Sequence, residues 1–113
     1  MTAKIQLSRG IDEQATDVKI TRSKDGDISV AVFIFDVPNC MTGETAGSNE
    51  ILGMYMIDDE GEMLTRNVNA KFVNGKASGI EAIHKIDGEV EWERFLRFMN
   101  RYAESNGMGL NKV

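Results

Sequence analysis

The sequence has one cysteine, one histidine and one proline among its 113 residues. A lone Cys40 cannot form an internal disulfide, which excludes a disulfide-framed fold and favours a reducing compartment. Cys40 and His84 together cannot supply the four ligands of a usual structural zinc site. Because Cys40 lies among small polar residues with no basic cluster beside it, we expect an exposed, unreactive thiol.

Long apolar runs are also missing, since no segment approaches the roughly 18 residues of a membrane span. The first twenty residues lack an apolar signal core and an Arg/Ser-rich transit character, so we expect a soluble protein made where it works. The 18 acidic residues exceed the 13 basic ones, and the net charge of -5 disfavours general nucleic-acid binding. With 42% hydrophobic residues and no linker, residues 1–113 are expected to form one domain.

No catalytic or nucleotide-binding motif is found. Neither form of glycine-rich phosphate loop occurs. His84 is the only imidazole and lies in a strand-like run, so we expect it to pack or to sit at an edge. Four carboxylates surround a turn glycine without the spacing of a calcium loop, so we expect them to be solvated; they are Asp58, Asp59, Glu60 and Glu62.

Period-two alternation and β-branched or aromatic residues predict strands over most of the chain. The run 28–35 is apolar on both faces and is expected to be a central strand, entered through a hairpin at 23–27. Asn74-Gly75 predicts a second tight hairpin, because both residues tolerate positive φ. The expected strands are residues 4–8, 17–21, 28–35, 50–57, 62–73 and 77–86.

From Val90 onward the apolar period changes to three and four residues, which predicts a helix that ends near Ser105, with Gly107 as its cap. The stripe expected to face the core is Trp92, Phe95, Leu96, Met99, Tyr102 and Ala103. The predicted fold class is α+β, an antiparallel β-sheet built as a meander of hairpins and covered by this C-terminal amphipathic helix.

The most organised charge feature is the arginine stripe, defined as Arg94, Arg97 and Arg101. Together with Arg22 and Lys24 it can face an anionic partner or a lipid surface. The alternative is a solvated helix face whose local partners are Glu91, Glu93 and Glu104.

Several blocks of the sequence resemble one family. They are IQLSRG at 5–10, TRSKDGD at 21–27, VAVFIFD at 30–36, GMYMIDDEGEMLTR at 53–66, KFVNGK at 71–76, IEA at 80–82 and EWERFLRFMNRYAESNGMGLNK at 91–112. The chain resembles, nearly end to end, the small photosystem II assembly proteins that are member twenty-eight of the Psb series. Departures from the commonest pattern lie at 37–49, at 84–90 and at Asn67, Asn69 and Ala70, and suit a second paralogue as well as an orthologue.

The resemblance implies a non-enzymatic extrinsic protein without a cofactor of its own, on the cytoplasmic (stromal) face of the thylakoid membrane. It implies transient binding to incomplete photosystem II, near the core antenna chlorophyll protein and the reaction-centre subunits, with peripheral membrane contact. We also expect the protein to hold no metal and to be monomeric alone. The alternative is a small-molecule or chlorophyll-precursor binding protein, which needs an apolar pocket of several hundred Å³.

A sheet edge can bind a partner's tail through main-chain bonds without a special motif. We therefore hypothesise that a tail of the core antenna subunit adds a strand to this sheet. The hairpin at 58–61 is expected to contribute to the contact, with Met54, Tyr55 and Met56 before it and Thr65 and Arg66 after it. Met54 and Met56 share one strand face, and for them the alternative is core filling.

Overall fold

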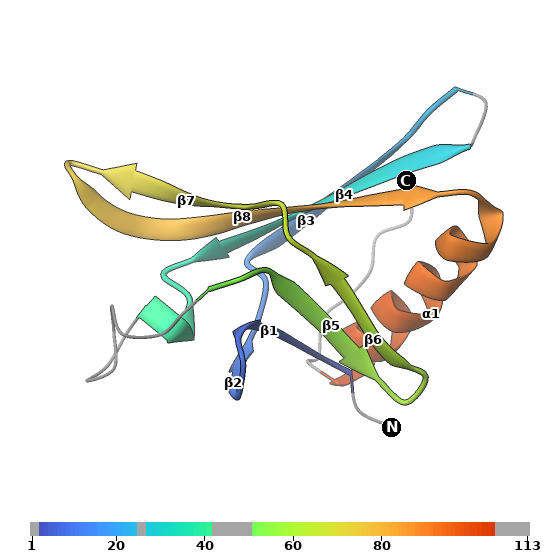
Figure 1. Cartoon of the computed structure of the whole chain (residues 1–113), viewed down its shortest axis with the longest axis horizontal. Helices are drawn as coiled ribbons and strands as arrows, with labels where there is room; N and C mark the ends of the chain where they lie inside the picture. The colour runs from blue at the N-terminus through green and yellow to red at the C-terminus, as the bar shows by residue number, and fades with distance from the viewer. Residues whose placement is uncertain (1–2, 25–26, 42–50, 106–113) are drawn as a thin grey trace.

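The computed structural model describes residues 3–24, 27–41 and 51–105. The strands form two four-stranded sheets in which every pairing is antiparallel. In spatial order the first sheet contains β2 (Ile11–Glu13), β1 (Lys4–Ser8), β5 (Met54–Asp58) and β6 (Gly61–Thr65). The second contains β3 (Asp17–Arg22), β4 (Ile28–Asp36), β8 (Lys76–Asp87) and β7 (Val68–Val73). A 3-10 turn η1 (Asn39–Met41) follows β4, and helix α1 (Glu89–Ser105) follows β8 (Figure 1).

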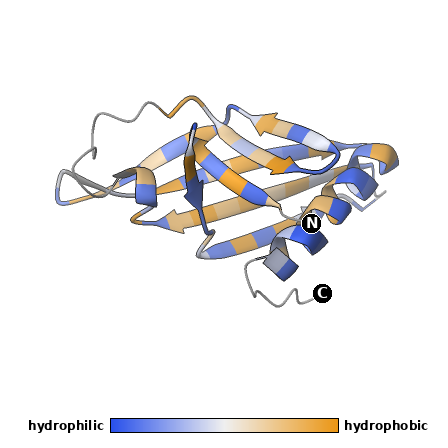
Figure 2. Cartoon of the chain, turned by 90° about the horizontal axis from the view of Figure 1, so that it is seen from below, coloured by the Kyte–Doolittle hydropathy of each residue, from blue (hydrophilic) through white to orange (hydrophobic). Residues whose placement is uncertain are grey.

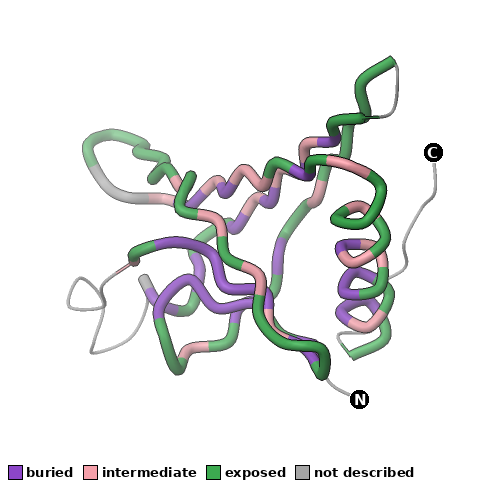
Figure 3. Tube along the Cα trace, turned by 45° about the vertical axis from the view of Figure 1, so that its right-hand side comes forward, coloured by how far each residue is buried: buried purple, intermediate pink, exposed green. Residues whose placement is uncertain are grey.

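The core lies between the two sheets and α1, as the burial along the chain shows (Figure 3). Strand β4 alternates strictly, with Ala31, Phe33 and Phe35 buried and their neighbours half-buried or exposed. Figure 2 shows the same alternation of polar and apolar residues along the strands. The α+β class expected from the sequence is therefore confirmed, and β4 is the central strand that its composition predicted.

Helix α1 closes one end of the space between the sheets (Figure 1). Its buried residues are Phe95, Phe98, Met99, Tyr102 and Ala103. Trp92 and Leu96, which the sequence placed inward, are only half-buried, and Phe98 belongs to the buried face instead. The Tyr102 hydroxyl accepts a hydrogen bond from the Ala15 N–H at 2.9 Å and donates to the Glu13 carbonyl at 3.3 Å. This pair of bonds ties the helix to the segment between β2 and β3.

The run 62–73 is two strands in different sheets, so the expected single sheet is wrong at this point. The chain changes sheet at Arg66 and Asn67, where the Asn67 carbonyl accepts from the Ile83 N–H at 2.9 Å. The Thr65 hydroxyl donates to the Ile83 carbonyl at 2.7 Å, which fastens the end of β6 to β8. The half-buried positions are odd-numbered in β6, at Met63 and Thr65, and even-numbered in β7, at Val68. This shift in the alternation marks the change of sheet in the sequence.

The two hairpins predicted from turn chemistry are confirmed. Asn74 and Gly75 have φ of 53° and 79°, as a tight turn between β7 and β8 requires. β3 and β4 pair from Asp17 with Ile34 to Arg22 with Ser29. The expected strand 50–57 begins at Met54, and the proposed cap Gly107 lies outside the described residues. No helix within those residues is long and apolar enough to cross a bilayer.

Candidate partner-binding surface

The arginine stripe points at the β5–β6 turn, which contradicts the outward orientation expected from the helix alone. Arg94 donates two hydrogen bonds to the Asp58 carboxylate, at 2.6 and 2.8 Å, and Arg101 donates a third at 2.9 Å. Arg97 donates to both carboxylate oxygens of Glu60, at 2.9 and 3.0 Å. Helix α1 is thus clamped to the turn by five charged side chains.

Asp58 is the buried member of this clamp, because its side chain has no exposed surface. Asp58 lies two residues after Met56 on β5, so its side chain points to the same buried face as Met54 and Met56. This alternation was the signal in the sequence that Asp58 is buried. Burial alone would raise the pKa of the Asp58 carboxyl, but the hydrogen bonds from Arg94 and Arg101 outweigh it and lower the pKa to about 2. The expectation that this acidic turn is merely solvated is wrong for Asp58.

Glu60 is the more exposed acid of the clamp. Hydrogen bonds from Arg97, and then from Arg101, lower the pKa of the Glu60 carboxyl to about 2. Its partner Arg97 keeps 48% of its side chain exposed, whereas Arg94 keeps 19% and Arg101 keeps 23%. Of the stripe, Arg97 therefore offers the most surface to a partner.

The remaining predicted contact residues fall into separate places. Met54 and Met56 are fully buried, so they reach a partner only if the core opens. Tyr55 is 8% exposed and is covered by Arg9, whose guanidinium carbon lies 4.0 Å from the ring centroid. Thr65 is half-buried and Arg66 is exposed where the chain changes sheet. Their role in partner binding stays a prediction.

Arg22 and Lys24 lie at the far end of β3 and beyond it. The Arg22 guanidinium carbon lies 4.4 Å above the Trp92 ring centroid, and Arg22 also contacts Glu89 at 3.7 Å. Lys24 is exposed. Neither residue contacts the β5–β6 turn that binds the arginine stripe. The predicted basic surface is therefore split into two separate places.

Cys40 is buried, which corrects the expectation of an exposed thiol. The Glu13 carboxylate accepts from the Asn39 N–H at 2.6 Å and from the Cys40 N–H at 2.8 Å, and so holds η1 against β2. Burial, followed by the charge of Glu13, raises the pKa of the Cys40 thiol to about 12. The thiol is consequently protonated and unreactive at neutral pH.

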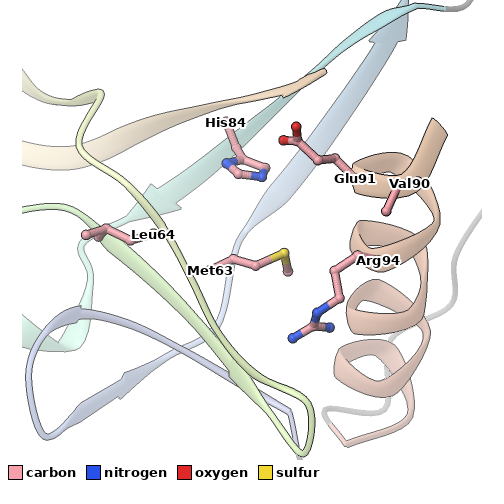
Figure 4. Close-up of a pocket in the computed structure, with 6 residues that line it drawn as sticks. All are labelled: Met63, Leu64, His84, Val90, Glu91 and Arg94. Atoms are coloured by element: carbon pink, nitrogen blue, oxygen red, sulfur yellow. The ribbon is translucent and has the colours of Figure 1, made fainter. Parts of the chain in front are cut away.

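A groove of about 370 Å³ lies between β6, β8 and α1 (Figure 4). His84 and Glu91 point toward each other on one side of the groove, and Met63 and Arg94 lie on the other. Leu64 and Val90 complete the lining. Burial lowers the pKa of His84, and the charge of Glu91 opposes this only in part. Sequence reasoning did not find this groove, because its walls come from three separate elements.

The two sheets leave four edge strands, and these differ in how accessible they are. β2 has three residues, and its ladder with β1 is irregular. β6 is fastened through Thr65 to β8, and its Glu62 contacts Arg9 at 2.6 Å. β7 carries a register shift between Lys71 and Phe72. β3 alone combines six residues with an unshifted ladder. It is the most regular edge in the described part of the chain.

Comparison with known proteins assigns the chain to a family. A sequence model described as "Psb28 protein" matches residues 5–110. Two cyanobacterial relatives are each called "Photosystem II reaction center Psb28 protein". The one from Synechococcus elongatus is 50% identical over the whole of both chains, and the one from Acaryochloris marina is 51% identical over 99% of each. A diatom relative of the same name, from Phaeodactylum tricornutum, is 50% identical over 100% of this chain and 99% of its own. The chain belongs to the Psb28 family of photosystem II proteins.

Proposed function

We propose that this protein is a non-enzymatic assembly factor that binds incomplete photosystem II transiently, on the cytoplasmic (stromal) face of the thylakoid membrane. Its partner there is the core antenna chlorophyll protein, next to the reaction-centre subunits. Membership of a family whose relatives are named for photosystem II supports the class of partner. The regular, exposed edge of β3 is the observation that supports binding by strand addition, because an extended tail of the partner can continue such a ladder.

The hydrogen bonds of β3 define which of its groups face a partner. Ser23 N–H donates to the Ile28 carbonyl at 2.7 Å, and bonded pairs in an antiparallel ladder recur every second residue. Thr21 and Lys19 are therefore bonded to β4, whereas the N–H of Ile20 points away from it. The Ile20 side chain is also 39% exposed. An added strand would pair with the backbone here and contact Ile20 with its own side chains.

We expect the arginine stripe to contribute less to the proposed contact than the β3 edge does. Arg101 donates to the buried Asp58, so reversing its charge would place two carboxylates together and disturb folding as well as binding. Arg97 is the member whose exposure allows it to contact an anionic loop without leaving the clamp.

Proline substitution distinguishes the edges, because proline removes an N–H that only a partner strand would use. We expect tagged protein carrying Ile20→Pro to lose capture of photosystem II core subunits from solubilised thylakoids, as read by mass spectrometry. Two matched controls, Leu64→Pro on β6 and Ala70→Pro on β7, also remove N–H groups that the ladders direct outward. Both controls should retain capture, and all three variants should keep a cooperative melting transition.

Other outcomes would change the proposal in defined ways. Loss of capture with Leu64→Pro alone would move the contact to the β5–β6 hairpin. Retention with all three prolines would exclude strand addition, and side-chain docking through Arg97 would replace it. If the wild-type protein captured no core subunit, the proposed function itself would be wrong.

The groove beside His84 favours one second candidate, a small-molecule or chlorophyll-precursor binding protein. Its volume of about 370 Å³ lies near the lower limit for such sites, and Met63, Leu64 and Val90 give it apolar walls. The ring centroid of Trp92, the single tryptophan, lies 6.2 Å from that of Phe95, which lies 5.7 Å from that of His84. Tryptophan emission should therefore report whether a ligand occupies the groove.

The assembly proposal predicts no saturable quenching of Trp92 emission when magnesium protoporphyrin is added. A carrier would instead show saturable quenching that the variant His84→Ala weakens. Leu52→Ala is a suitable control, because Leu52 is 57% exposed and does not line the groove. Saturable, His84-dependent binding would therefore favour the second candidate.

A further inference from the structure

The distal part of the β7–β8 hairpin has a composition unlike that of the rest of the chain. Residues 63–80 contain no acidic residue and three basic ones, Arg66, Lys71 and Lys76. Outside this run the chain has 10 basic residues against 18 acidic ones. One segment of an acidic protein is therefore locally cationic. Its residues 68–80 form β7 and the first part of β8, whereas the rest of β8 carries Glu81, Lys85 and Asp87.

The tip of this hairpin lies at the end of the second sheet opposite α1 (Figure 1). On β7 every residue from Asn69 to Val73 is exposed (Figure 3). Lys71 is 45% exposed, and its contact with Glu81, at 3.6 Å, is a surface pair of the kind that contributes little. Arg66 and Lys71 are consequently available to a partner.

The tip of the hairpin carries two large apolar side chains that the fold does not cover. Phe72 is 66% exposed and Val73 is 59% exposed. Successive side chains of a strand point to opposite faces, so both faces of the ribbon are apolar at its tip. A protein surface normally covers one face of a ribbon, whereas a lipid interface surrounds an inserted tip. Exposed aromatic and aliphatic residues flanked by lysines are the composition of interfacial membrane anchors.

We propose that the β7–β8 hairpin is a membrane anchor that places Phe72 and Val73 among the headgroups of an anionic lipid surface. The inference deepens the proposed function, because it assigns the peripheral membrane contact to a segment separate from the β3 edge. The Asn74-Gly75 turn keeps the tip narrow enough to enter the interface. The basic residues hold the hairpin at a surface that repels the acidic remainder of the chain.

Flotation with lipid vesicles tests this inference. The wild-type protein should bind phosphatidylcholine vesicles containing about one-third phosphatidylglycerol, bind pure phosphatidylcholine less, and be released by salt. The double variant Phe72→Ser, Val73→Ser should bind roughly tenfold more weakly, because it loses most of the apolar area available for insertion. Leu52→Ser is the control, since Leu52 is 57% exposed and lies outside both the hairpin and the groove, and it should bind as the wild type does.

A second measurement does not depend on loss of binding. Phe72→Trp should show a blue-shifted emission and quenching by brominated lipid, beyond the signal that Trp92 gives in the wild-type protein. Equal binding by wild type and double variant, or no wild-type binding at all, would overturn the membrane anchor. If the double variant instead lost photosystem II capture in detergent, the hairpin would be a protein-docking element and the lipid inference would be wrong. Vesicle binding without any capture would support the anchor and contradict the proposed function.

Discussion

Replacing Phe95 with alanine is expected to lower the free energy of unfolding by about 3 to 5 kcal/mol. Phe95 has no exposed surface, and its ring lies edge-on to Phe33, with the centroids 6.2 Å apart. His84 lies on another side of the same ring, with the centroids 5.7 Å apart. Removal of the ring would leave a cavity between α1 and the second sheet that these neighbours cannot fill. Urea unfolding followed by circular dichroism measures the loss.

Two other positions on α1 serve as comparisons for Phe95. Phe98→Ala should cost a similar amount, because Phe98 is fully buried and stacks on Tyr102 with centroids 5.8 Å apart. Leu96→Ala should cost clearly less, since Leu96 is only half-buried. A larger loss at Leu96 than at Phe98 would mean that the inward face of the helix has been wrongly assigned.

Removing the buried carboxylate of the clamp should be about as harmful. Asp58→Ala removes both hydrogen-bond acceptors of Arg94 and one of the two carboxylates that bind Arg101, and breaking a buried ion pair costs about 3 to 5 kcal/mol. For a chain of this size we expect a melting temperature lowered by roughly 10 to 25 °C. Asp59→Ala is the control, because Asp59 is the exposed neighbour in the same turn and should change stability by less than about 0.5 kcal/mol.

The pH dependence of the same clamp follows from the lowered pKa of Asp58. Because the folded-state pKa is about 2 and the ordinary value is 3.8, the carboxylate stabilises the fold above about pH 4 and loses this effect as the pH falls toward 2. The difference in stability between wild type and Asp58→Asn should therefore shrink over this range. Glu60 titrates in the same range in both proteins, so its contribution largely cancels in the comparison. A difference that stayed constant down to pH 2 would contradict the assigned role of Asp58.

Local patterns in the sequence determined the elements of this fold. The strands β1, β3 and β4, the Asn74-Gly75 hairpin and the end of α1 near Ser105 were predicted from alternation, turn chemistry and helical periodicity. Each of these signals depends on residues a few positions apart, where backbone geometry restricts the choice directly. The long blocks of family resemblance likewise needed no structure, and the comparisons confirmed them.

Contacts between distant segments were decided by the tertiary structure alone. Helical periodicity showed that the three arginines share a face, but the partner of that face lies 36 or more positions away, in Asp58 and Glu60. Cys40 is buried in a turn whose backbone donates to Glu13, 27 positions earlier. The chain passes from one sheet to the other where Thr65 donates to the backbone of Ile83, 18 positions later. A local pattern specifies which face a residue occupies, whereas only the packing of the whole chain specifies what that face meets.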